Sequence, residues 1–200
     1  MYQQVAAPTE PVVLNKARGI ILIMGCVLSI GLMIGALKTP LYNIEQFIGA
    51  NTITSNIYVS KSCIEINGQS KCVDYTDGPE FCSDFVSQLH KIRDAYIATA
   101  VVLGVALLLA GADVAGVLKQ RMVHVATLGV AACAALAGFI LVFVTFNGTY
   151  CNVTLSDLPG DAYGVTPIST PSASPFLCMG AGIGIIVGMV LAAALKDKPA

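Results

Sequence analysis

The sequence predicts an all-α membrane protein, in which a bundle of four transmembrane helices carries a small disulfide-braced β-hairpin and a short helix in its first outer loop. The prediction rests on four long apolar stretches, on the polar segments between them and on the positions of the cysteines. At about 1.5 Å per residue, each stretch is long enough to cross the roughly 30 Å hydrocarbon core of a bilayer. The stretches are Ile20–Leu37, Ala95–Leu118, Val125–Phe146 and Phe176–Leu195.

The composition agrees with a membrane protein. Hydrophobic residues make up 56% of the chain and charged residues 12%, and the mean hydropathy is +0.76. Soluble domains usually have about a quarter of their residues charged. The net charge of −1 argues against a nucleic-acid partner, because such binding needs a basic face that displaces counterions. Membrane lipids are therefore the expected surroundings.

The first apolar stretch follows Lys16 and Arg18, as the core of a signal peptide would, and the small Ala36 leaves cleavage open. Its apolar region is nevertheless longer than the roughly 7–15 residues usual in signal peptides, so we interpret it as an uncleaved span. The predicted order is a tail at 1–17, spans at 18–37, 95–118, 125–146 and 176–195, outer loops at 38–94 and 147–175, a cytosolic link at 119–124 and a tail at 196–200.

Basic residues near the ends of the spans predict the orientation, because Lys and Arg favour the cytoplasmic side. One side carries Lys16, Arg18, Lys119, Arg121, Lys196 and Lys198, and the other carries Lys38, Lys91 and Arg93. We expect both termini in the cytosol, in the plasma membrane or another membrane of the secretory pathway.

The positions of the cysteines support the same assignment of segments to the two sides of the membrane. Cys63, Cys72, Cys82 and Cys151 lie in the expected outer loops, whereas Cys26 and Cys133 lie within spans and Cys178 near the outer end of the last one. Disulfides persist in oxidising compartments, so this placement favours the secretory lumen or the cell exterior. Reduced cysteines in an organellar membrane are the alternative.

A β-hairpin is predicted around Asn67-Gly68, the dipeptide preferred in two-residue type I′ turns. Counting outward from this turn places Cys63 opposite Cys72, on a non-hydrogen-bonded pair with Cα atoms about 4.5 Å apart, which is within disulfide range. The same register places Lys61 opposite Asp74. A metal site is the weaker alternative, since there is no second cysteine pair at zinc-finger spacing.

A helix is predicted to follow the hairpin and to run into the second span. Asp77-Gly78-Pro79-Glu80 has the composition of a turn before a helix start. The helical spacing of Phe81, Phe85, Leu89 and Ile92 predicts one apolar face, packed on the hairpin or on the membrane surface. Cys82 could bond to Cys151 and join the two loops, although spacing alone leaves the connectivity open.

Three segments resemble the amastins, surface glycoproteins of trypanosomatid parasites, whose layout is similar to that of the claudin and peripheral-myelin-protein tetraspans. They are Lys38-Thr-Pro at the end of the first span, Cys63-Ile-Glu-Ile-Asn-Gly-Gln-Ser-Lys-Cys72, and Cys178-Met-Gly-Ala-Gly-Ile-Gly at the start of the last span. The chain departs from the family pattern in having Asn67 where an aromatic residue is usual, and in having its two cysteines one residue closer. The resemblance implies a surface tetraspan.

The second outer loop contains two N-glycosylation patterns, at Asn147 and Asn152. Both lie so close to the end of the third span that their use is left open. Downstream, the stretch 165–175 is rich in Ser, Thr and Pro, a composition that cannot bury enough apolar surface to fold alone. We expect this stretch to form a mobile stalk.

Small residues at four-residue spacing predict close helix packing within the spans. The clearest sets are Gly31 and Gly35 in the first span and Gly180, Gly184 and Gly188 in the last, with Ala112 and Gly116 and Ala134 and Gly138 between them. Packing within the chain is the first interpretation, and self-association through the last span is the alternative.

Asp113 is the one formal charge expected within a span. It lies near the cytosolic end, where it could reach the interface or pair with Lys119, Arg121 or His124. A carboxylate at membrane depth is a candidate functional residue. Without matching charges on other spans, however, anchoring is favoured over proton relay.

The sequence therefore predicts a non-enzymatic surface tetraspan that organises membrane or contacts protein partners, or copies of itself, through a disulfide-braced outer domain. A channel or transporter component that uses Asp113 and the small-residue faces is the alternative. An integral-membrane enzyme is the third class, because His90, His124 and the carboxylates form no catalytic motif. We expect no cofactor and no metal.

Overall fold

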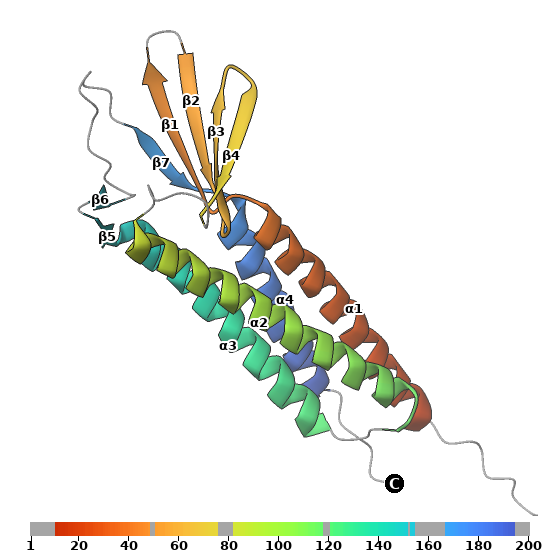
Figure 1. Cartoon of the computed structure of the whole chain (residues 1–200). Coiled ribbons are helices and arrows are strands. Elements are labelled where there is room, and N and C mark those ends of the chain that lie inside the picture. Colours follow the sequence, from red (N-terminus) through yellow and green to blue (C-terminus); the bar gives the residue numbers. More distant parts are fainter. Residues whose placement is uncertain are drawn as a thin grey trace, which may run out of the picture.

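The computed structural model describes residues 11–48, 51–75, 82–117, 121–151, 153–154 and 167–194. Four long helices pack side by side, and a small sheet stands at one end of them (Figure 1). The helices are α1 (Pro11–Lys38), α2 (Ser83–Val114), α3 (Arg121–Asn147) and α4 (Ala173–Ala194). Each of them contains a segment long and apolar enough to cross a membrane. The prediction of four such helices with a small β element is confirmed.

Helix α2 is continuous, so the short helix predicted after the hairpin and the second apolar stretch form one element. It ends at Val114, ahead of the predicted boundary at residue 118. Gly116 terminates it in the left-handed conformation, with φ +77°, and its N–H donates to the Asp113 carbonyl at 3.0 Å while the N–H of Val117 donates to that of Ala112. This is a Schellman C-cap. Gly116 therefore ends a helix rather than packing against one.

The main sheet has five antiparallel strands in the order β4-β3-β2-β1-β7 (Figure 1). The prediction of one hairpin in the first loop was incomplete, because that loop contributes four strands. A separate two-stranded ribbon pairs β5 (Thr149–Tyr150) with β6 (Val153–Thr154). The strands of the main sheet are β1 (Tyr42–Ile48), β2 (Asn51–Ile57), β3 (Lys61–Ile66), β4 (Gln69–Asp74) and β7 (Ile168–Pro171).

Strand β7 corrects the expectation of a mobile stalk at 165–175. Four residues of this stretch pair with β1, from Tyr42 opposite Pro171 to Glu45 opposite Ile168. The following turn is tied down as well, since Ser172 donates its N–H to the Leu41 carbonyl at 2.8 Å and the Ser174 hydroxyl donates to the Ala36 carbonyl at 2.7 Å. Backbone pairing with β1 orders a segment that has too little apolar surface to order itself.

The β3–β4 hairpin has the predicted register, with Cys63 opposite Cys72 and Lys61 opposite Asp74. Asn67 and Gly68 both have positive φ, +52° and +78°, as a type I′ turn requires. This part of the prediction is confirmed.

One core joins the sheet to the helices. Tyr42 at the start of β1 is fully buried; its hydroxyl donates to the Val142 carbonyl of α3 at 2.6 Å and its ring stacks on Phe146, with centroids 5.5 Å apart. Burial raises the pKa of Tyr42, so the hydroxyl keeps the proton that it donates. Leu89 and Ile92 of α2 enter the same core as Ile57 and Tyr75. The predicted apolar face of α2 therefore packs inside the molecule, while Phe81 lies outside the described residues.

Candidate functional site

The sheet end of the molecule carries both disulfides. Cys63 bonds to Cys72 across the β3–β4 hairpin, and Cys82, just before α2, bonds to Cys151, just after the short strand β5. Phe85 and Tyr150 lie beside the second bond in sequence, and their rings are 5.8 Å apart. The first bond stiffens one hairpin, and the second ties the start of α2 to the segment that follows α3.

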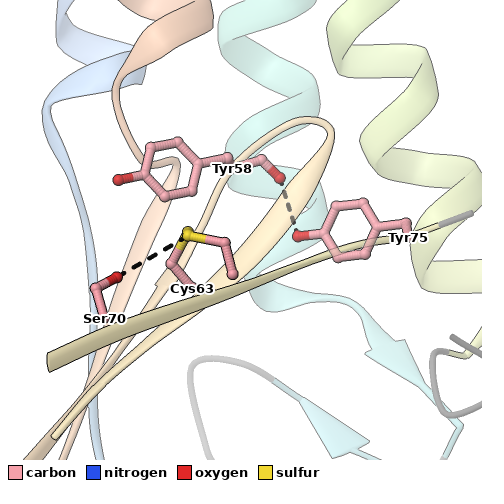
Figure 2. Close-up of a disulfide and its surroundings, with 5 residues drawn as sticks. Tyr58, Cys63, Ser70 and Tyr75 are labelled. Atoms are coloured by element: carbon pink, nitrogen blue, oxygen red, sulfur yellow. Dashed lines mark hydrogen bonds between the residues drawn. A yellow bond between two sulfur atoms is a disulfide. The ribbon is translucent and has the colours of Figure 1, made fainter. Parts of the chain in front are cut away.

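Tyr58 and Tyr75 flank the hairpin disulfide (Figure 2). The Tyr75 hydroxyl donates to the Tyr58 carbonyl at 3.0 Å, and Lys61 places its Nζ 5.6 Å from the centre of the Tyr58 ring. Burial raises the pKa of Tyr75, which keeps this donor protonated. Cys63 is buried, whereas Cys72 is exposed and faces the Ser70 hydroxyl. The hairpin is thus fixed on one side by covalent, aromatic and hydrogen-bonding contacts.

The opposite end of the helices holds a buried ion pair. Arg18 of α1 donates from Nε and Nη2 to the two carboxylate oxygens of Asp113 of α2, at 3.0 to 3.1 Å. Both side chains are almost fully buried, at 2% and 1% exposure. His124 of α3, also buried, places Nε2 3.6 Å from Asp113 Oδ2, beyond hydrogen-bond length. Three helices thus each contribute one polar side chain to this cluster.

This pairing corrects the expected surroundings of Asp113. Of its predicted partners, His124 is adjacent, Lys119 lies outside the described residues, and nothing is described of the Arg121 side chain. The main partner is Arg18, which sequence reasoning used only as a basic residue flanking the first span. The expectation that no other span carries a matching charge was therefore wrong. The signal was present, because Arg18 and Asp113 lie near the same predicted end of consecutive spans.

The glycines predicted to pack helices divide into two groups. A Cβ on Gly35, Gly180 or Gly184 would meet Leu177, Leu32 or Ser29 of the facing helix, at 3.3, 3.7 and 3.1 Å. A Cβ on Gly31 or Gly188 would meet nothing within 4 Å, so these two do not pack closely against a neighbour. Among the helix glycines, the tightest approaches are at Gly19 against Val114 and at Gly138, also predicted to pack, against the Tyr96 ring. Spacing found Gly138 and the α1–α4 contact but missed Gly19.

Opposite effects are expected from adding one methyl group at two glycines. Gly138→Ala places a Cβ 2.9 Å from the Tyr96 ring and should destabilise the protein by about 1–3 kcal/mol. Gly188→Ala meets open space and should stabilise it by about 0.5–1 kcal/mol through helix propensity. Equilibrium unfolding of the purified protein in mixed detergent micelles measures both, and a shift of the same sign for the two variants would contradict this packing.

A cavity lies between the helices, with a volume of about 10 Å³. Its walls are almost entirely apolar and include Leu22, Cys26, Leu103, Leu128 and Ile185. It has room for about one water molecule, against about 300–1,000 Å³ for typical ligand pockets. Within the described ranges, no three His, Cys, Asp or Glu side chains are grouped so that they could hold a metal ion.

The remaining predicted residues are placed as follows. Asn147 is the last residue of α3; it is exposed, and its Nδ2 donates to the Phe143 carbonyl at 2.9 Å. Asn152 lies outside the described residues. The buried Cys178 thiol donates a hydrogen bond to the Ala135 carbonyl at 3.3 Å. Cys26 is also buried, and Cys133 is exposed on α3.

Comparison with known proteins adds no assignment. No protein-family model matches the chain, and no curated protein sequence matches it significantly.

Proposed function

We propose that this chain is a non-enzymatic four-span surface protein that organises membrane or contacts partners through its disulfide-braced sheet. The sheet would lie outside the cell or in the secretory lumen, and both termini in the cytosol. The observation that carries the proposal is the division of the molecule: the main sheet stands at one end of the four helices (Figure 1). Both disulfides lie at that end, and the helices are long and apolar enough to cross a membrane.

The outward surface of the helices supports membrane insertion. Each helix exposes large apolar side chains, with Met24 at 67%, Leu108 at 76%, Met122 at 74% and Val190 at 57%. Soluble monomers rarely expose contiguous apolar patches larger than a few hundred Å². In a bilayer, lipid chains would cover these apolar side chains and keep them from water.

The disulfides support the proposed sides. Such bonds persist in oxidising compartments, so the sheet end is expected to face the lumen or the exterior. The other end carries Lys16, Lys119, Arg121, Lys196 and Lys198 in the sequence, as the positive-inside rule expects for a cytosolic side.

Anchoring rather than transport is the proposed role of Asp113. Arg18 occupies both of its carboxylate oxygens, and the cavity between the helices is apolar and water-sized. A proton or ion relay needs a polar path that leads away from the carboxylate. The cluster is better suited to holding α1, α2 and α3 in register.

We further propose that the protein is amastin-like. The support is the disulfide-closed segment Cys63–Cys72, the order of the helices and loops, and the glycine-rich start of α4 that follows Cys178. The family resemblance implies a surface glycoprotein, for which Asn147 and Asn152 are the candidate acceptors.

Native lysines test the proposed sides without any insertion into the chain. A membrane-impermeant amine reagent applied to intact cells should modify Lys71, which is exposed on β4, and spare Lys196 and Lys198. All three should react after the membrane is permeabilised, which is the control for reagent access. Peptide mapping by mass spectrometry measures the result. Labelling of Lys196 and Lys71 together on intact cells would overturn the four-span topology, and labelling of neither would place the protein in an internal membrane.

A further inference from the structure

The two faces of the main sheet differ in chemistry. Side chains directly opposite each other on paired strands share a face, so the register divides the residues. One face, here called the apolar face, carries Ile44, Ile53, Ile57, Ile64, Ile66, Val73 and a single described charge, Lys71. The other face carries the Cys63–Cys72 disulfide with Lys61, Glu45, Glu65 and Asp74. The acidic side chains of the sheet all lie on this second face.

The part of the chain that the structure describes covers the apolar face only at its helix end. Tyr42 and Ile57 are buried there against the core, whereas Ile64, Ile66 and Val73 are 45%, 44% and 38% exposed. These three side chains are neighbours of Lys71, which lies directly opposite Ile64 and two residues from Val73. An exposed apolar group with a cation at its margin favours a partner that brings apolar side chains and one acidic group.

Strand β4 is an edge of the sheet. Of the strands that the structure describes, only β3 pairs with it, and all six of its residues are exposed. The other edge, β7, is short, follows Pro167 and ends at Pro171, and these two prolines cannot donate to a further strand. Strand β4 contains no proline, and the disulfide to β3 holds it in place. The preorganised edge is therefore β4.

The register identifies which backbone groups of β4 point outward. Tyr75 donates its N–H to the Ser60 carbonyl at 3.3 Å, and hydrogen-bonded and non-hydrogen-bonded pairs alternate along an antiparallel ladder. Gln69, Lys71 and Val73 therefore bond to β3, whereas the N–H and C=O groups of Ser70, Cys72 and Asp74 face away from it. The short Cα separation of Cys63 and Cys72, 4.0 Å, fits a non-hydrogen-bonded pair. An extended peptide is the ligand that such a row of groups fits.

We propose that the β4 edge docks an extended segment of a partner protein, which adds as an antiparallel strand and places an acidic residue opposite Lys71 and an apolar residue opposite Val73. This proposal deepens the proposed function and rests on it for the compartment in which the partner is met. A second copy of the chain fits less well, because pairing two β4 strands about Lys71 would place like charges opposite each other.

Two end-capped peptides of identical pattern test this partner chemistry. Thr-Val-Thr-Glu-Thr-Val carries the acidic residue at the position opposite Lys71, and Thr-Val-Thr-Lys-Thr-Val is its charge-reversed control. Fluorescence anisotropy with the full chain in nanodiscs should show about tenfold tighter binding of the first peptide. Amide hydrogen exchange should slow at Ser70, Cys72 and Asp74 when it binds, with little change at Lys71 and Val73, whose amides already bond to β3.

Three variants distinguish docking on the β4 edge from nonspecific adsorption of the peptides. Ser70→Pro removes an outward N–H without breaking a bond to β3 and should abolish binding. Lys71→Glu should reverse the preference between the two peptides. Lys61→Glu, a charge reversal on the opposite face of the same hairpin, should leave both affinities unchanged.

The proposal would be overturned if the two peptides bound equally or if neither bound. An unchanged preference in Lys71→Glu would also overturn it, even if Ser70→Pro fails to fold. A concentration-dependent dimer of the parent that Ser70→Pro abolishes would overturn it in favour of a second copy. Because nanodiscs expose both ends of the molecule, failure here with the expected lysine labelling on cells would leave the proposed function standing.

Discussion

Replacing Arg18 by Met is expected to lower the free energy of unfolding by about 3–5 kcal/mol, because Asp113 is then left charged, buried and without its bidentate partner. Asp113→Leu should cost a similar amount by leaving Arg18 without this carboxylate. The double variant Arg18→Met/Asp113→Leu should recover most of the loss, since it removes both charges and keeps the volume filled. A double-mutant cycle from equilibrium unfolding in mixed micelles measures the coupling.

The matched control is Arg93→Met. Arg93 pairs with Asp94 at 3.4 Å, but the two side chains are 39% and 67% exposed, so the change should cost less than about 1 kcal/mol. Additive losses in the Arg18 and Asp113 double variant would show that the two side chains act independently. The same double variant, reconstituted in liposomes, should carry as much or as little ion flux as the parent; flux lost with normal folding would favour the transport alternative.

Removing the Cys82–Cys151 disulfide by paired serine substitutions is expected to cost about 4 kcal/mol, the larger of the two disulfide effects. The bond closes a sequence separation of 69 residues, whereas Cys63–Cys72 closes one of 9, for which about 2–3 kcal/mol is expected. The difference arises because a longer loop loses more conformational freedom in the unfolded chain.

Unfolding of the two paired variants, Cys82→Ser/Cys151→Ser and Cys63→Ser/Cys72→Ser, under one set of conditions provides the comparison. Non-reducing peptide mapping of the parent first establishes that both bonds are present. An equal loss for the two pairs, or a larger loss for the hairpin, would contradict the loop-length argument. Retained binding of the acidic peptide by the Cys82–Cys151 variant would show that the β4 edge is preorganised locally.

The sequence predicted the features that depend on neighbouring residues. Hydropathy over about 20 residues identifies each long apolar helix, because the hydrocarbon core sets a minimum length. The Asn67-Gly68 turn determines the pairing of the next residues on each side, so the Cys63–Cys72 bond followed from counting.

Features that depend on distant contacts were missed. Strand β7 has no strand composition of its own, and pairing with β1 orders it. The partner of Asp113 was missed because Arg18 was treated only as a residue flanking its span, whereas the packing of α1 against α2 brings it beside Asp113. Four-residue spacing likewise could not show that Gly31 faces outward while Gly19 packs against Val114.

The pairing of β1 with β7 has a consequence for the order of assembly during synthesis. Tyr42 pairs with Pro171, which lies far along the chain, so β1 is synthesised early and lacks its second neighbour until α2 and α3 have followed. Contacts so distant in sequence form late in folding. Truncated chains that stop before residue 167 are therefore expected to expose the β1 edge, and chains that extend past β7 should have it covered.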